Sequence, residues 1–204
     1  MSIIITDLCK TFDDNEVLKN VNITLKDNSI YCLMGASGIG KTTFLRTLMG
    51  LEHADSGSVS GIDMKSISCM FQEDRLIPYL SAIDNVRIVL RGKNNRDEVR
   101  NNLLSILPDD SLDMPVSSLS GGMKRRVALA RALSYPGKLI LLDEPFTGLD
   151  KDTKLNVIDY ILKMRNNRTL LIATHGTDDE KKYAPTLIPL AAACCMLYFA
   201  LVSA

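Results

Sequence analysis

The chain carries one stretch from which its fold can be inferred: Gly35-Ala36-Ser37-Gly38-Ile39-Gly40-Lys41-Thr42-Thr43. The apolar run Ile30–Met34 before it is typical of a buried strand, and the apolar residues after it recur at helical spacing from Phe44 to Met49. A strand, a glycine-rich turn and a helix in this order predict a phosphate-binding loop of the form G-x-x-x-x-G-K-[ST].

Each residue type in this loop has a physical reason. Glycines let the backbone turn tightly, so that its amides and the helix N-terminus face an anion. Lys41 would reach the β- and γ-phosphates, and the Thr42 hydroxyl would bind Mg²⁺. The alternative is an ordinary glycine-rich turn, but the lysine, the threonine and the preceding strand favour the phosphate loop.

Composition narrows the class of protein. A length of 204 residues favours one domain, and 24 basic residues balance 24 acidic ones, so net charge does not indicate nucleic acid. The chain has no Trp and five cysteines without C-x-x-C spacing, which argues against base-stacking platforms, zinc and a disulfide framework. The cysteine pattern is compatible with a reducing cytosol, and the N-terminus lacks the pattern of a signal peptide.

The order of elements predicts an α/β fold. Strands are expected at Ser2–Thr6 and Val21–Leu25 before the loop, and at Ile67–Phe71 after it. The pattern then turns helical from Ser81, where Ser81 and Asp84 resemble a capping box. Because this helical segment lies between strands of one sheet, we expect an inserted helical subdomain over about residues 74–134.

Polar residues follow three of the predicted strands. Asp143 and Glu144 end an apolar strand, where adjacent carboxylates are costly unless something uses them. A magnesium ion held by Thr42 and Asp143 would explain them, leaving Glu144 to polarise an attacking water. Gln72 and His175 each end a strand, and for both the alternative is an ordinary solvated strand end.

Two further helix starts carry candidate residues. Ser120 can cap a helix, and Gly121 and Gly122 would leave its first amides open to a second anion. The alternative is a plain capped helix whose basic residues lie on a solvated face. Asp150 precedes Lys151–Met164, where its ordinary role is that of an N-cap.

Taken together, the motifs resemble the ATP-binding subunit of an ATP-binding-cassette (ABC) transporter. Phe12, the phosphate loop, Gln72, the Leu119–Met123 signature, Asp143-Glu144, Asp150 and His175 occur in the order of that family. The resemblance covers about residues 1–183. It implies a phosphate-loop NTPase fold with a mainly parallel core sheet, a small antiparallel β subdomain and the inserted helical subdomain.

The resemblance implies a role for each site residue. Glu144 would be the general base, His175 would contact the γ-phosphate, and Gln72 would contact Mg²⁺ or the attacking water. Asp143 would hold Mg²⁺ together with Thr42. ATP would be bound by residues of two subunits: Phe12, Gly35, Ser37, Gly38, Gly40, Lys41, Thr42 and Thr43 from one, and Ser120, Gly121, Gly122 and Asp150 from the other.

The resemblance also implies a function. The expected protein is an ATPase on the cytoplasmic face of the membrane that works as a cassette dimer, with a homodimer favoured. It would couple ATP hydrolysis to transport through a separate permease, with a substrate-binding protein as a further candidate partner. Residues 71–78 look like those of the nitrate, sulfonate and taurine import branch. The alternatives are a soluble non-transport ABC ATPase and a nucleotide-gated regulatory module with low turnover.

Two features depart from the family pattern. Met123 stands where Gln is usual, which predicts reduced rather than absent activity. Residues 184–204 contain no charged residue and form a nearly continuous apolar run, which approaches the roughly 20 residues of a membrane-spanning helix. This tail is interpreted as a membrane anchor or the start of a fused permease helix, as a buried element of the core, or as an altered sequence end.

Overall fold

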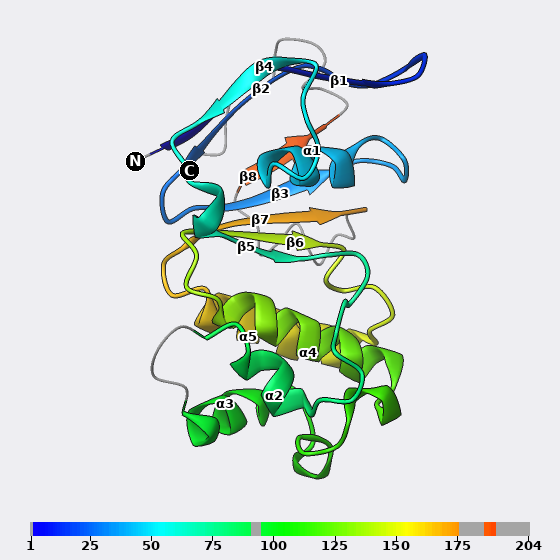
Figure 1. Cartoon of the computed structure of the whole chain (residues 1–204), viewed down its shortest axis with the longest axis vertical. Coiled ribbons are helices and arrows are strands. Elements are labelled where there is room, and N and C mark those ends of the chain that lie inside the picture. Colours follow the sequence, from blue (N-terminus) through cyan, green and yellow to red (C-terminus); the bar gives the residue numbers. More distant parts are fainter. Residues whose placement is uncertain (1, 91–94, 176–185, 191–204) are drawn as a thin grey trace. The chain divides into compact units, whose positions relative to one another are not determined.

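The computed structural model describes residues 2–90, 95–175 and 186–190, and Figure 1 shows their helices and strands. The chain divides into two compact parts: unit 1 is Met1–Met64 with Ala173–Ala204, and unit 2 is Lys65–Ile172. The predicted end of the ATPase domain at residue 183 and most of the apolar tail, residues 191–204, lie outside the described residues. In the part of the chain that is described, no helix is long and apolar enough to cross a membrane.

Unit 1 contains a three-stranded antiparallel sheet in the order β2-β1-β4. Its strands are β1 (Ser2–Phe12), β2 (Asn15–Lys26) and β4 (Ser56–Ser60). In β2, Val21, Ile23 and Leu25 are buried while the residues between them are exposed, so the predicted half-exposed strand is confirmed.

Strand β1 continues well beyond its predicted end at Thr6. The buried positions are Ile3 and Ile5, two residues apart, but the next is Leu8, three residues further on. Between Ile5 and Leu8 the pairing with β2 shifts register, and Asp7 has a φ of 47°. An extra residue at a β-bulge moves the following side chains to the other face of the strand. The bulge therefore interrupts the alternation of buried and exposed residues, which is why the sequence pattern placed the end of the strand too early.

The phosphate-loop elements of unit 1 are β3 (Ile30–Met34) and α1 (Lys41–Leu48), as predicted. Phe44, Leu45 and Leu48 of α1 are buried. Strand β8 (Thr186–Pro189) pairs in parallel with β3. These four tail residues thus form a strand beside the one that enters the glycine-rich loop.

Unit 2 contains the parallel pair β5 (Ile67–Met70) and β6 (Leu139–Asp143). All five residues of β6 are buried, as expected for a strand covered on both faces. Strand β7 (Thr169–Thr174) begins in unit 2, and its last two residues belong to unit 1. The parallel and antiparallel strands with their helices agree with the predicted phosphate-loop NTPase fold.

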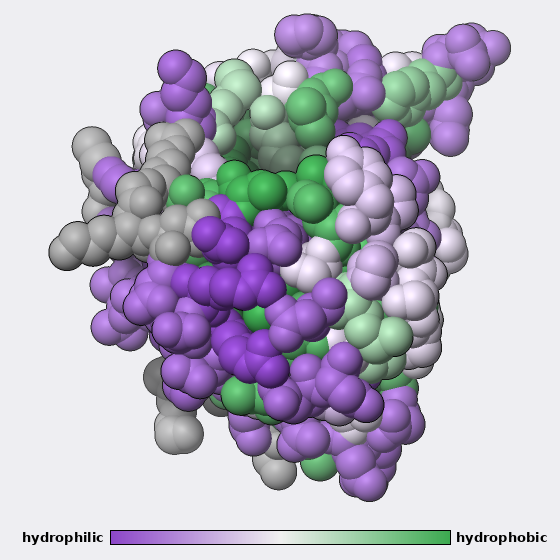
Figure 2. All heavy atoms as spheres, turned by 60° about the horizontal axis from the view of Figure 1, so that its bottom comes forward, coloured by the Kyte–Doolittle hydropathy of each residue, from purple (hydrophilic) through white to green (hydrophobic). Residues whose placement is uncertain are grey.

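The four helices described in unit 2 each contribute buried apolar residues to its core. They are α2 (Ala82–Arg87), α3 (Arg96–Leu103), α4 (Gly121–Ser134) and α5 (Lys151–Met164), with 3₁₀ turns at Asp109–Ser111 and Val116–Ser118 and another, Met64–Ser66, at the unit boundary. Figure 2 shows one face of the molecule, on which hydrophilic side chains predominate and hydrophobic ones form smaller patches.

Two helices are shorter than their apolar spacing suggested. Helix α2 starts at the predicted cap, where Ser81 Oγ accepts from the Asp84 amide at 3.1 Å, and it ends at Arg87, before the apolar residues Ile88, Val89 and Leu90. Helix α3 ends at Leu103, although apolar residues continue at helical spacing from Val99 to Leu107. The amides of Ile106 and Leu107 both donate to the Leu103 carbonyl, so the chain tightens there and turns these apolar residues into the core.

Candidate functional site

The glycine-rich loop leads into a helix whose first turn has no side-chain cap. Gly40 is the N-cap of α1 and has a φ of 104°, a left-handed conformation that favours glycine. A Cβ at Gly40 would lie 2.7 Å from Val17 Cγ1 and 3.1 Å from the Val17 carbonyl oxygen. This position therefore requires glycine, and the first amides of α1 can face an anion.

Lys41 is almost completely buried, with 6% of its surface exposed. Its Nζ donates to the Gly35 carbonyl at 2.7 Å and to the Ala36 carbonyl at 3.1 Å, and it lies 3.4 Å from His175 Nδ1. Because an ammonium can only donate, Nδ1 is the acceptor in that contact. The fold of unit 1 thus brings together two residues 134 positions apart that were both predicted to bind phosphate.

The other candidates of unit 1 lie around the same loop and at the β1–β2 hairpin. Ser37 and Gly38 are exposed, while Thr42 and Thr43 are half-buried in the first turn of α1. Phe12 ends β1 and is 41% exposed, with Lys10 Nζ 5.0 Å from the centre of its ring. An exposed aromatic ring with a cation on it remains available to a planar partner.

In unit 2, Asp143 is the last residue of β6 and Glu144 follows it, at the level where β5 also ends. Met70 pairs with Leu142, so Gln72 and Glu144 each stand two residues past the same point of the parallel pair. The carboxyl ends of parallel strands are where ligands bind in α/β sheets. Asp143 is buried and Glu144 is half-buried, whereas Gln72 is exposed.

Glu144 has an unusual backbone conformation. Its φ of 51° lies in the left-handed region, which costs a residue with a Cβ roughly 1–2 kcal/mol. Such conformations persist where the surrounding structure holds them, and they gather at functional sites. The strained residue here is the predicted general base.

Arg125, which sequence reasoning missed, holds these two strand ends together. The sequence pattern assigned it no role beyond the alternative of a solvated basic face, but its side chain is buried and donates to the carbonyls of Phe71, Gln72, Asp143 and Glu144. Helical spacing could have indicated that Arg125 is buried. It lies three residues before Ala128 and four before Leu129, so it shares a face of α4 with these buried residues.

The signature residues begin α4 as predicted. Ser120 Oγ accepts from the Met123 amide at 3.3 Å, so the backbone of Met123, and not its side chain, makes the N-cap hydrogen bond of α4. A Cβ added to Gly121 would meet nothing within 4 Å, and one at Gly122 would lie 3.7 Å from Leu149 Cδ2. Neither glycine is required by packing within unit 2.

Asp150 is the N-cap of α5, as the sequence predicted. Its carboxylate accepts from the Thr153 amide at 3.0 Å and from the Thr153 hydroxyl at 2.7 Å. The backbone hydrogen bond from Thr153 lowers the pKa of Asp150 below its ordinary value. The side chain is exposed and negatively charged at neutral pH.

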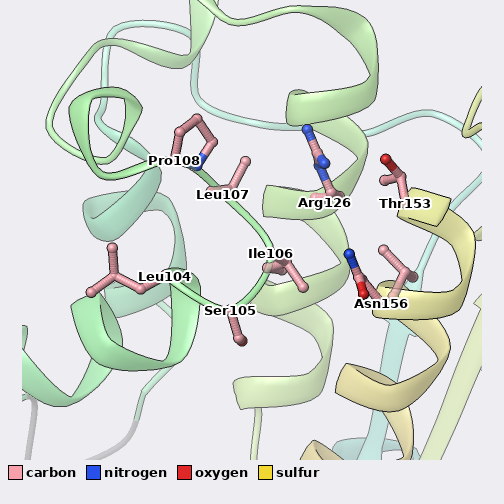
Figure 3. Close-up of a pocket in the computed structure, with 9 residues that line it drawn as sticks. Leu104, Ser105, Ile106, Leu107, Pro108, Arg126, Thr153 and Asn156 are labelled. Carbon is pink, nitrogen blue, oxygen red and sulfur yellow. The ribbon is translucent and has the colours of Figure 1, made fainter.

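A separate pocket of about 270 Å³ lies in unit 2 (Figure 3). It is bounded by the loop Leu104–Pro108, by Arg126 of α4, and by Thr153 and Asn156 of α5. None of the predicted site residues lines it, so it is distinct from the predicted nucleotide-binding residues.

The residue types predicted to bind nucleotide and Mg²⁺ are chemically suited to these ligands. The Thr42 hydroxyl and the Asp143 carboxylate are hard oxygen ligands of the kind that Mg²⁺ prefers, and Mg²⁺ is usually bound by few protein groups together with phosphates. The Gly40 turn and the buried Lys41 provide the matching anion cradle.

Comparisons with known proteins agree with these observations. A protein-family profile described as "ABC transporter" matches residues 18–147. The aliphatic sulfonates import ATP-binding protein SsuB 1 of Paracoccus denitrificans is 36% identical over 185 residues, which are 90% of this chain and 76% of that protein. The protein of the same name from Nocardia farcinica is 38% identical over 193 residues, covering 93% and 78%.

Further similarities extend to an iron importer and to solved structures. The Fe(3+) ions import ATP-binding protein FbpC of Photobacterium profundum is 34% identical, covering 91% of this chain and 58% of that protein. The dimeric post-hydrolysis structure of the ATP-binding cassette MJ0796, bound to ADP and Pi, matches with a TM-score of 0.79 and 28% identity. That match covers 92% of this chain and 93% of the other.

Proposed function

This chain belongs to the ABC transporter family and is an ATP-binding, ATP-hydrolysing subunit, and from that premise we propose that it powers an importer through the residues described above. The observation that supports this most is the juxtaposition of buried Lys41 with His175 at the uncapped start of α1. This arrangement offers a cation, an imidazole and helix amides to one group of phosphates.

Nucleotide binding is assigned to the loop of unit 1. The glycine-rich backbone and Lys41 hold the β- and γ-phosphates, while Phe12 presents its ring to adenine. His175 bonds the γ-phosphate. Lys41 exchanges its bonds to the Gly35 and Ala36 carbonyls for bonds to phosphate oxygens, which are stronger because both partners are charged.

Hydrolysis is assigned to the strand ends of unit 2. Glu144 accepts the proton of the attacking water, and Gln72 orients that water. Thr42 and Asp143 would hold Mg²⁺, which neutralises charge on the phosphates. The strained backbone of Glu144 supports this role, because such strain is retained where function requires the geometry.

The active form is proposed to be a homodimer in which each nucleotide contacts both subunits. Ser120, Gly121 and Gly122 present the start of α4 to the ATP held by the other subunit, and Asp150 reaches across the interface. The open space at Gly121 supports this, since a missing side chain that the subunit itself does not require leaves room for a ligand from outside. Met123 contributes its backbone amide to the Ser120 cap, which does not depend on its side chain, so we expect reduced rather than absent turnover.

The transport partner is proposed to be a separate membrane permease, with the cassette peripheral on its cytoplasmic side. The named relatives are import ATP-binding proteins, which supports import over export. An importer also implies a substrate-binding protein as a further partner.

Two variants test the assignment. Glu144→Gln should keep ATP affinity and nearly abolish turnover, because it removes the base while preserving shape. Lys41→Ala should instead weaken ATP binding by roughly 10- to 100-fold, the value of a charged hydrogen bond of about 1.5–3 kcal/mol. ATP turnover and nucleotide titration of both variants measure this, and parental turnover in Glu144→Gln would exclude Glu144 as the base.

A further inference from the structure

Arg125 donates hydrogen bonds to five acceptors around the ends of β5 and β6. Nη1 donates to the Phe71 carbonyl at 3.0 Å, to the Gln72 carbonyl at 2.7 Å and to Asp74 Oδ1 at 3.0 Å. Nη2 donates to the carbonyls of Asp143 at 2.6 Å and Glu144 at 2.8 Å. One guanidinium thus joins the segment after β5 to the segment after β6.

We propose that Arg125 is a positioning residue for hydrolysis, which fixes the backbone of Gln72 and Glu144 relative to the signature helix α4. This inference rests on the proposed function of Glu144 and Gln72. Arg125 does not touch the reacting atoms, because its partners at these residues are backbone carbonyls.

The backbone conformation of Glu144 explains why hydrogen bonds from Arg125 are needed there. Its left-handed φ of 51° is maintained only if the surroundings stabilise it, and Arg125 Nη2 binds its carbonyl directly. The guanidinium is itself well held, since its side chain is 8% exposed and pairs with Asp74. A buried, ion-paired arginine with bonds to fixed carbonyls has little freedom to move.

Because Arg125 belongs to α4, its hydrogen bonds also connect this helix to the backbone of Gln72 and Glu144. Ser120 caps the same helix five residues earlier, and Gly121 begins it. A displacement of this helix when its first turn engages the nucleotide of the other subunit would be passed through Arg125 to the carbonyls of Gln72 and Glu144. The general base and the water-orienting residue are thereby linked to the engagement of the opposite site.

The first test replaces Arg125 with Lys and with Met in the full chain. Lys keeps the charge but offers one nitrogen with three donors, which cannot span all five acceptors, and Met keeps only the volume. For Met we expect kcat to fall on the order of 100-fold, the cost of a misplacement of about 1 Å, and for Lys a smaller loss. The Kd for ATP should change by less than about twofold, since the loss is confined to the transition state.

Arg168→Met is the matched control. Arg168 also binds backbone carbonyls, those of Leu133, Tyr135, Met164 and Arg165, but none of them belongs to the strand ends. This variant should lose thermal stability while keeping the parental kcat. An equal fall of kcat in both variants would show that Arg125 acts only through general stability, which would overturn the proposal.

A double variant separates positioning from other effects. If Arg125 acts through Glu144, adding Arg125→Met to Glu144→Gln should lower the residual turnover little further, and ATP-dependent dimerisation should persist. Fully additive losses, or loss of the dimer, would overturn the proposal. If Glu144→Gln alone kept the parental rate, the assignment of Glu144 as general base in the proposed function would fail. Parental kcat in Arg125→Met beside an inactive Glu144→Gln would refute only the role of Arg125.

Discussion

Replacing Gly121 with Asp should stabilise the separate subunit and yet disable the enzyme. A Cβ at Gly121 meets nothing within 4 Å, so the new side chain fits. Asp is a slightly better helix residue than Gly, and a carboxylate in the first turn of a helix gains roughly 0.3–1 kcal/mol from the macrodipole. The melting temperature should therefore rise by about 1–4 °C.

The same carboxylate would face phosphate if α4 binds the nucleotide of the other subunit. Two like charges about 4 Å apart at an effective dielectric constant of about 20 repel by roughly 4 kcal/mol. This corresponds to a loss of about a thousandfold in dimer formation or turnover. ATP affinity of the monomer should be unchanged, because the phosphate loop lies elsewhere in the chain.

The assays are thermal melting, nucleotide titration, ATP turnover, and light scattering in the Glu144→Gln background with ATP. Gly121→Asn is the control, since it has the same size without the charge and should lose much less activity. Parental turnover in Gly121→Asp would refute the shared site. A drop in melting temperature of several degrees would refute the conclusion that the position is open within the subunit.

Two further predictions concern stability. Gly40→Ala should destabilise the chain by at least about 1–2 kcal/mol and lower its melting temperature by about 2–8 °C, because its φ of 104° and the 2.7 Å approach to Val17 both oppose a Cβ; an unchanged melting temperature would contradict this. Hydrogen bonding from Ser81, with the nearby Arg96 and Arg87, lowers the pKa of Asp84 below its ordinary value. Its contribution to stability is therefore complete above the unfolded-state pKa and is lost as the pH falls through the lower folded-state pKa. Asp84→Asn should accordingly shrink the difference in unfolding free energy between pH 6 and pH 3, measured by denaturant titration, and an identical difference in the variant would contradict the assignment.

Local signals predicted the elements that carry the candidate site. Ile30–Met34 is a strand with the predicted bounds, and the helix after the glycine-rich loop begins at Lys41. The caps Ser81, Ser120 and Asp150 accept the hydrogen bonds that their positions implied. These features depend on neighbours a few residues away, so the sequence pattern contains what is needed.

Features that depend on distant partners could not be predicted. The desolvation of Arg125 is offset by carbonyls up to 54 positions away, which no local pattern reveals. The four residues of β8 lie in an uncharged run, and a parallel strand and part of a membrane helix can have the same apolar composition. Only the pairing of Met34 with Pro189 and its neighbours distinguishes them.

The pairing of β3 with β8 has a consequence for how the protein is made. Residues 65–172 form a continuous unit, whereas unit 1 joins the segment before residue 65 to the segment after residue 172. The strand that enters the glycine-rich loop therefore waits for Thr186–Pro189 to be translated. During that interval a nascent chain exposes an unpaired strand edge, which is the kind of surface that chaperones protect.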